Sequence, residues 1–204
     1  MIAELISVGT EILLGNIVNT NSAYLAEKCA QLGLSLYYQT VVGDNEGRMR
    51  ETIRTALDRS DIIILTGGLG PTEDDLTKEI TAEVMGLPLK EDAHTRQLLE
   101  DYLAQYQKND AQRRTTSNNY KQALVPEGAY ILDNHNGTAP GLIMEKDGKT
   151  AVLLPGPPGE MKPMFEEKVY PYLRKKQPET IFSQMVKICS IGESQVADEI
   201  QDLI

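Results

Sequence analysis

An unbroken run of large aliphatic residues at positions 62–65 is the feature that most limits what this chain can fold into. Three consecutive isoleucines are followed by Leu65, with Asp61 before the run and Thr66 after it. A strand with one wet face alternates apolar and polar side chains, whereas a strand covered on both faces does not. Residues 61–66 therefore predict a central strand of a parallel sheet with helices on both sides.

Similar strand–loop–helix units precede this run. Strands are expected over residues 5–8 and 34–42, and a loop over residues 9–16. The helical spacing of apolar residues predicts helices from about residue 19 to 32, over 46–59 and over 75–85. Three such units in succession favour a doubly wound parallel sheet, with Cys29 as a small core residue of the first helix.

The second half of the chain continues with mixed elements. Helices are expected over residues 93–107 and 116–124, with a polar, exposed segment at 108–115 between them. Strands follow at 129–132, 141–145 and 150–154. The last two are joined by a hairpin turn at Asp147 and Gly148. A helix over residues 160–173 completes this part.

A charged, proline-containing segment at residues 174–179 marks a change of composition. Beyond it we expect a strand over 181–189, ending in a buried Cys189, and an amphipathic helix over 194–204. Two elements cannot bury a core alone. The sequence therefore predicts one domain over residues 1–172 and a linker with the truncated start of a small α+β second domain over residues 173–204.

The charge balance restricts the partners. The chain has 30 acidic and 20 basic residues, a formal net charge of -10, which disfavours nucleic acid and anionic lipid as ligands. It carries no targeting segment and no apolar run long enough for a membrane span, so a cytoplasmic location is expected. An acidic protein binds phosphate locally, through backbone N–H groups, helix N-termini or a metal held by carboxylates.

The loop at residues 66–75 combines three glycines with three acids. The glycines at 67, 68 and 70 let a phosphate approach backbone N–H groups closely. Glu73, Asp74 and Asp75 follow at the start of the expected helix. Asp74 or Asp75 could simply cap that helix, but capping needs only one carboxylate. The pattern favours a divalent cation held by Asp75 with Asp74. It is not a P-loop, because no Lys-Ser/Thr pair ends it.

Other polar loops are expected at the same edge of the sheet. Glu11 follows the first strand and could be a general base, an indirect metal contact or a solvated acid. Asp44 follows the second strand and could equally start the next helix. The loop at 155–159 offers a helix N-terminus as an anion site, and the loop at 134–141 could close over a ligand. Either could be a plain turn.

Three motifs, at residues 9–15, 66–77 and 154–161, together resemble the competence/damage-inducible CinA family over roughly residues 1–170. The resemblance implies a three-layer α/β/α sandwich like the molybdopterin-binding fold of MoaB- and MogA-like proteins. In the molybdenum-cofactor enzymes of that fold the matching loops usually have Thr, Arg and Ser at the positions of Leu69, Asp74 and Pro157. These departures favour the CinA branch over molybdopterin adenylylation.

The resemblance implies a metal-dependent pyrophosphatase that acts on ADP-ribose and similar nucleotide pyrophosphates. Asp75 and Asp74 would hold Mg, Mn or Co, with potassium as a further candidate, and Asp44 or Glu11 would orient the attacking water. The nicotinamide mononucleotide amidohydrolase domain of many family members is absent from these 204 residues, so no deamidase activity is assigned. The alternatives are a pterin-binding or pterin-adenylylating protein and a non-catalytic nucleotide-binding scaffold.

The expected partner is a small-molecule nucleotide, with neither nucleic acid nor membrane, in a homodimer. The residues expected to contact substrate or phosphate are Gly9, Thr10, Asn21, Thr66, Gly67, Gly68, Gly70, Thr72, Asn136, Gly137, Thr138, Gly156 and Pro157.

Overall fold

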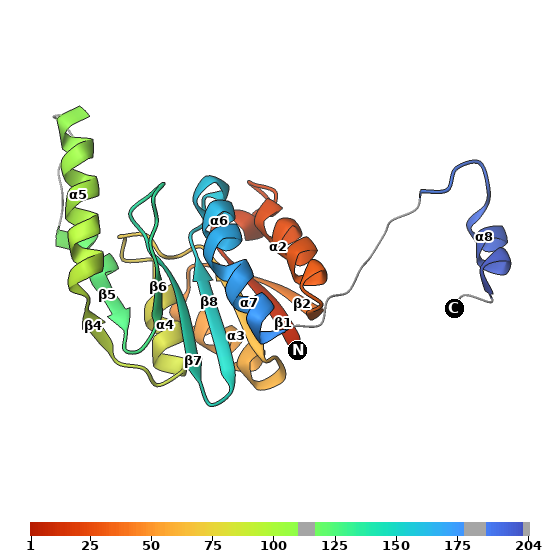
Figure 1. Cartoon of the computed structure of the whole chain (residues 1–204), viewed down its shortest axis with the longest axis horizontal. Coiled ribbons are helices and arrows are strands. Elements are labelled where there is room, and N and C mark those ends of the chain that lie inside the picture. Colours follow the sequence, from red (N-terminus) through yellow and green to blue (C-terminus); the bar gives the residue numbers. More distant parts are fainter. Residues whose placement is uncertain (110–116, 178–186, 202–204) are drawn as a thin grey trace.

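A six-stranded sheet in the order β2-β1-β3-β8-β7-β6 forms the middle layer of the protein (Figure 1). The structure is a computed structural model that describes residues 1–109, 117–177 and 187–201. The first four strands in this order run parallel, and the fifth pairs antiparallel with both of its neighbours. The strands are β2 (Ser35–Val42), β1 (Ile2–Val8), β3 (Ile62–Thr66), β8 (Lys149–Leu154), β7 (Gly141–Lys146) and β6 (Tyr130–Leu132). The predicted mostly parallel sheet is confirmed.

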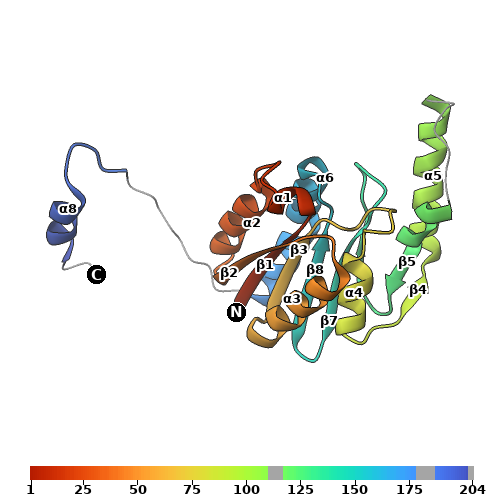
Figure 2. The ribbon, with the colours of Figure 1, turned by 180° about the vertical axis from the view of Figure 1, so that it is seen from behind.

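Helices cover both faces of this sheet, as Figures 1 and 2 show from opposite sides. On one face α3 (Glu46–Arg59) and α4 (Thr77–Val84) pack on the strands. On the other face lie α2 (Thr20–Gln31) and a helical run made of α6 (Pro158–Met164), the π-helical turn η2 (Phe165–Val169) and α7 (Tyr170–Lys176). The three-layer α/β/α sandwich is therefore confirmed.

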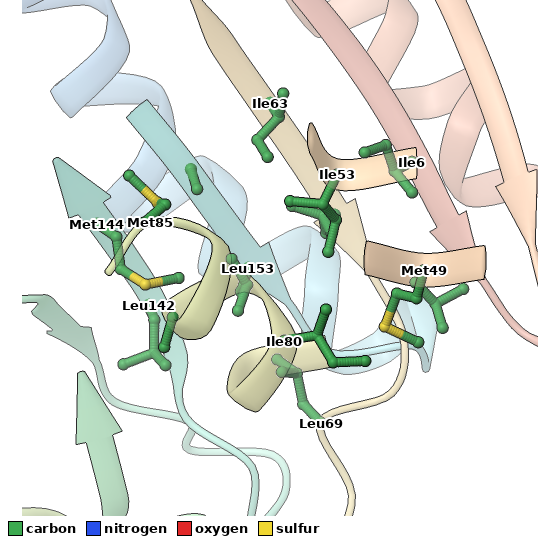
Figure 3. Packing of buried hydrophobic residues seen from close by; sticks show 14 of the residues in the cluster. Ile6, Met49, Ile53, Ile63, Leu69, Ile80, Met85, Leu142, Met144 and Leu153 are labelled. Carbon is green, nitrogen blue, oxygen red and sulfur yellow. The ribbon is translucent and has the colours of Figure 1, made fainter. Parts of the chain in front are cut away.

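The burial of β3 on both faces explains why its sequence does not alternate apolar and polar residues. Ile63 and Leu65 belong to the core under α3 and α4, and Ile62 and Ile64 belong to the core under α2 and α6. All four side chains are fully buried. Figure 3 shows the first of these cores, where residues of β1, β3 and β8 meet residues of α3 and α4. A strand buried on both faces has no position for a polar side chain.

Two boundaries near the predicted site differ from expectation. Residues Thr10–Leu13 form a short helix, α1, where a loop was predicted. The helix predicted from residue 75 begins only at Thr77, with Leu76 at its N-cap and no side-chain cap. The alternative that Asp74 or Asp75 caps this helix is therefore wrong. Asp75 instead turns back to Thr72, with which it closes a tight turn before the helix.

The chain leaves the sandwich after α4 and returns at β6. This side arm consists of β4 (Leu89–Glu91), α5 (Ala93–Asn109), the 3-10 helix η1 (Ser117–Ala123) and β5 (Leu124–Pro126). β4 and β5 form a small antiparallel sheet that was not predicted, because strands of three residues show no usable periodicity. The predicted helix at 116–124 is the 3-10 helix. Residues 110–115 of the predicted polar segment, and residue 116 of that helix, lie outside the described residues.

The C-terminal part differs in several ways. The helix predicted over 160–173 runs on to Lys176. Its π-helical turn begins at Phe165, two residues after Pro163, which cannot donate a helical hydrogen bond. Cys29 is buried as predicted, but Cys189 is exposed and residues 187–189 are not in a strand. The remainder of that predicted strand lies outside the described residues. The last predicted helix is α8 (Glu193–Glu199), which buries no residue.

Candidate functional site

A cavity of about 600 Å³ lies at the carboxyl ends of β1, β3 and β8, where the loops after these strands meet. Ligand sites of parallel α/β sheets occur at this edge. Most of the residues predicted for the site line this cavity, although they come from six separate segments of the sequence. They are Gly9, Glu11, Asn21, Asp44, Thr66, Gly67, Gly68, Gly70, Thr72, Asp74, Asp75, Thr138, Gly156 and Pro157.

The first two glycines of the loop after β3 have backbone conformations that favour glycine. Gly67 has φ +95°, and a Cβ atom there would lie 2.3 Å from the Val8 carbonyl oxygen. Gly68 has φ +65°, and its Cβ would lie 2.1 Å from Oγ1 of Thr77. That hydroxyl donates to the Gly67 carbonyl at 2.9 Å. The loop therefore crosses the end of β1 and meets the start of α4 with no space for side chains.

The amides of this loop are divided between structure and ligand. The Gly67 amide donates to the Leu154 carbonyl at 3.1 Å and extends the sheet. The amides of Gly68 and Gly70 make no hydrogen bond to another described residue. Backbone N–H groups of this kind bind phosphate oxygens. Gly67 thus shapes the loop, and Gly68 and Gly70 are the members that can bind an anion.

Leu69 and the side arm hold the loop from two sides. The Leu69 side chain is 8% exposed and packs in the core beside Ile80 of α4 (Figure 3). From η1, Gln122 Nε2 donates to the Leu69 carbonyl at 3.1 Å. The preceding residue, Lys121, donates from Nζ to the carbonyls of Thr72, at 3.1 Å, and Asp75. Two consecutive residues of η1 therefore fix three carbonyls of the loop.

Lys121 and Gln122 were not predicted as site residues. Both lie near the C-terminal end of a segment whose spacing only indicated a helix, and their contacts span 46 to 53 positions of sequence. A lysine and a glutamine in such a segment are ordinary surface residues. No local pattern in the sequence could have assigned them.

Asp75 and Asp74 are the two acids expected to hold a cation. Asp75 Oδ2 accepts from the amide of Thr72 at 3.0 Å and from its hydroxyl at 2.5 Å. Gly70 leaves room for this carboxylate, because a Cβ there would lie 2.4 Å from the same oxygen. Oδ1 of Asp75 has no hydrogen bond to another described residue, and Asp74 is exposed at the cavity.

A metal held by the protein alone is not supported by this arrangement. Within residues 1–109, 117–177 and 187–201, no group of three or more His, Cys, Asp or Glu side chains is placed to hold a metal ion. Mg²⁺, however, commonly binds one or two carboxylates and takes its remaining ligands from water and substrate phosphates. The pair Asp74 and Asp75 fits a cation that arrives with a phosphate ligand.

Asp44 and Glu11 have different roles in the geometry. Asp44 Oδ2 accepts from the Thr10 amide at 2.9 Å and from the Thr10 hydroxyl at 2.8 Å. This pair ties the first residue of α1 to the loop after β2, and Thr10 itself does not line the cavity. Glu11 lies in the first turn of α1, lines the cavity and forms no ion pair or side-chain hydrogen bond with another described residue. Glu11 is therefore the freer of the two acids to accept a proton.

The loop at residues 134–139 is held against the N-terminus of α6. Asn134 Nδ2 donates to Glu160 Oε2 at 2.7 Å, and Asn136 Nδ2 donates to the Gly159 carbonyl at 3.2 Å. A Cβ at Gly137 would lie 2.1 Å from Glu160 Oε2. Asn136 and Gly137 do not line the cavity, whereas Thr138 does. Their contacts place Thr138 at the cavity wall.

Asn21 joins the start of α2 to the loop after β8. Asn19 caps α2, because its Oδ1 accepts from the Ser22 amide at 3.1 Å, and its Nδ2 donates to Ser7 of β1 at 2.9 Å. Two residues on, Asn21 Nδ2 donates to the Gly156 carbonyl at 2.7 Å. The predicted cap at residues 19–22 is confirmed, and it brings Asn21 into the cavity wall.

The protein combines an α/β/α sandwich with a glycine loop and neighbouring acids at one edge of the sheet, which are features of a known protein family. The sequence profile of the family described as "Probable molybdopterin binding domain" matches residues 4–175, so the chain belongs to that family. A tungsten cofactor synthesizing protein MoaB from Pyrococcus furiosus shares the fold, with a TM-score of 0.51 at 18% identity over 87% of this chain and 96% of that one.

Within the family the chain groups with the CinA proteins. It is similar to a CinA protein of unknown function from Thermoplasma acidophilum, with a TM-score of 0.68 and 38% identity over 82% of this chain and 96% of that one. It is 53% identical over all its 204 residues to a competence-damage inducible protein from Clostridium beijerinckii, covering 48% of that protein. The chain thus spans about half the length of the curated relatives it matches.

No helix among the described residues is long and apolar enough to cross a membrane.

Proposed function

We propose that this domain hydrolyses ADP-ribose or a related nucleotide pyrophosphate in a metal-dependent reaction. The observation that carries the proposal is one cavity lined both by Gly68 and Gly70, whose amides have no partner among the described residues, and by the acids Asp74 and Asp75. Amides alone would suit any phosphate. Adjacent carboxylates would repel that phosphate unless a cation came with it.

The roles in binding follow from the contacts of each group. Gly68 and Gly70 donate to phosphate oxygens, and Oδ1 of Asp75 with Asp74 holds the cation. A divalent cation bound there supplies charge neutralisation for the pyrophosphate and lowers the pKa of a bound water. Lys121 keeps the loop in place through its hydrogen bonds to the Thr72 and Asp75 carbonyls. The protein thus presents preformed donors at the reacting phosphate.

Proton transfer is assigned to Glu11. Water attacks one phosphorus atom, the bridging P–O bond breaks, and AMP and ribose 5-phosphate are formed. The Glu11 carboxylate accepts the proton that the water loses, because this acid lines the cavity without an ion pair or side-chain hydrogen bond among the described residues. Asp44 keeps α1, and with it Glu11, at the cavity through its two hydrogen bonds to Thr10.

The proposal is tested by phosphate release. ADP-ribose has no terminal phosphate, whereas both expected products are phosphomonoesters that a phosphatase hydrolyses. We expect phosphate release in the coupled assay with Mn²⁺ or Co²⁺ and none with EDTA. Absence of turnover across ADP-ribose and related nucleotide pyrophosphates, with every metal, would contradict the proposal.

A pterin-binding function is the second candidate, because the family profile that covers residues 4–175 carries that description. The same amides and carboxylates would then hold the phosphate of molybdopterin. Tight molybdopterin binding without ADP-ribose turnover would favour this candidate. Leu69 weighs against it only as a departure from the sequence usual in molybdenum-cofactor enzymes, since its side chain packs in the core.

A further inference from the structure

Gln122 of η1 is a buried residue whose amide oxygen has no protein partner. Its side chain is 2% exposed and belongs to the wall of the cavity. Oε1 makes no hydrogen bond within the described part of the chain, although Nε2 donates to the Leu69 carbonyl at 3.1 Å. Buried side-chain oxygens are paired in most proteins, because an unpaired one loses hydration without compensation. Such an oxygen in a cavity wall is a candidate ligand contact.

The hydrogen bond to the Leu69 carbonyl fixes the orientation of the Gln122 side-chain amide. A carbonyl oxygen only accepts, so the amide must present its NH₂ group to Leu69 and turn its oxygen away. The opposite orientation would bring two acceptors together. Gln122 therefore offers an acceptor, which pairs with an N–H or O–H group and repels a phosphate or carbonyl oxygen.

The place of Gln122 narrows the choice of ligand group. Its own partner, Leu69, lies between Gly68 and Gly70, and the amides of these three residues have no partner among the described residues. A ligand whose phosphates bind those amides has its nearest neutral groups within a few bonds of this part of the cavity. In a nucleotide pyrophosphate these groups are ribose hydroxyls and the exocyclic amine of the base. Both are hydrogen-bond donors without charge.

We infer that Gln122 is a specificity-determining residue of the cavity, whose Oε1 accepts a hydrogen bond from a hydroxyl or amine of a bound nucleotide. The inference rests on the proposed function for the class of ligand but does not need hydrolysis. A site built around a buried acceptor discriminates strongly against a ligand that lacks the matching donor. Gln122 would thus select among nucleotide pyrophosphates that the glycine loop alone cannot distinguish.

Binding of analogues that cannot be cleaved tests this inference separately from hydrolysis. The probe is ADP-ribose with a methylene group in place of the bridging oxygen, titrated into the protein by calorimetry with Mg²⁺ present. Its inosine counterpart lacks the base amine, and its deoxy counterparts lack one ribose hydroxyl each. For the wild type, we expect Kd to rise by about 10- to 100-fold for the analogue that lacks the donor paired with Oε1.

Two variants separate recognition from a structural role. Gln122→Met removes the acceptor and is expected to bind the parent and that analogue with equal Kd. Gln122→Glu keeps an acceptor oxygen and is expected to keep the discrimination. Its charge and the loss of the Nε2 donor to the Leu69 carbonyl should weaken all ligands by a common factor. The analogue whose Kd rises with the wild type, either the inosine or one of the deoxyribose analogues, identifies the group that donates to Oε1.

Three outcomes would overturn the inference. The wild type could bind all the analogues equally, or bind none of them. Alternatively, Gln122→Met could weaken every ligand by the same factor and leave the discrimination intact, as expected if the side chain only supports Leu69. If discrimination is present but ADP-ribose is not hydrolysed, the inference stands and the proposed hydrolysis fails.

Discussion

At the scale of single residues, Gly67 is the most constrained position in the loop after β3. It combines a positive φ with a Cβ position 2.3 Å from the Val8 carbonyl oxygen. Gly148, in the hairpin between β7 and β8, has a φ of +78° but open space around its Cβ position. The two glycines therefore separate backbone strain from steric overlap.

We expect Gly67→Ala to lower the free energy of unfolding by more than about 2 kcal/mol, because strain and overlap with the backbone add. Gly148→Ala carries the strain alone and should cost about 1 kcal/mol. Urea unfolding of both variants beside the wild type measures the difference. Equal losses in the two variants would show that the overlap at Val8 is relieved at no cost.

The sequence could predict those residues of the site whose chemistry is visible locally. Glycines next to a buried strand and three consecutive acids can be recognised without a structure, and Asp75 and Gly68 line the cavity as expected. Lys121 and Gln122 could not be predicted, because their function depends on contacts with carbonyls about 50 positions away. Backbone carbonyls leave no trace in a sequence.

At the scale of elements, the side arm depends on the cap of α5. Asp92 Oδ1 accepts from the Thr95 amide at 2.7 Å and from its hydroxyl at 2.8 Å. The hydrogen bond from the Thr95 amide is the main reason that the pKa of Asp92 lies below its usual value of 3.8. The ionised cap stabilises the start of the helix that leads toward η1, Lys121 and Gln122.

Asp92→Ala is expected to destabilise the protein by about 1 kcal/mol at pH 7. The folded-state pKa is depressed, so the contribution of ionised Asp92 is present above the unfolded pKa and is lost as pH falls through the folded pKa. Asp92→Asn caps the helix without titrating, so its stability relative to wild type should rise as the pH is lowered from 5 toward 3. Urea unfolding midpoints of the wild type and both variants across this pH range test these predictions. A difference in stability between Asp92→Asn and wild type that does not change with pH would contradict the second prediction.

The sequence predicted elements where the pattern is long and missed those that tertiary contacts impose. The long aliphatic and amphipathic segments became β3, α3 and α5. The start of α4 was misplaced by two residues, because Asp75 closes a turn with Thr72 instead of beginning the helix. β4 and β5 exist only as a pair, so neither three-residue segment is recognisable alone.

At the scale of the whole molecule, the last buried side chain among the described residues belongs to α7. Leu173 is fully buried, whereas α8 buries no residue. A chain that ends at Gln177 should therefore have a Tm within about 2 °C of the 204-residue chain. Differential scanning calorimetry of the two chains is the measurement. A fall of more than about 5 °C would show that residues beyond 177 contribute to the core of the first domain.

Association of the chain is the other prediction at this scale. We propose a homodimer, and sedimentation equilibrium should give about twice the chain mass of 22.6 kDa. A monomeric mass at all concentrations would contradict the dimer and leave the proposed site unchanged.

The central claim is that Asp75 holds the cation for pyrophosphate hydrolysis at the glycine loop. The value of kcat/KM for ADP-ribose at saturating Mn²⁺ tests this claim most directly. Asp75→Asn keeps an oxygen that can accept from Thr72, so the loop should fold as before, with an unchanged Tm. Loss of the charge should nevertheless lower kcat/KM by at least about 100-fold. Full activity of Asp75→Asn would contradict the account.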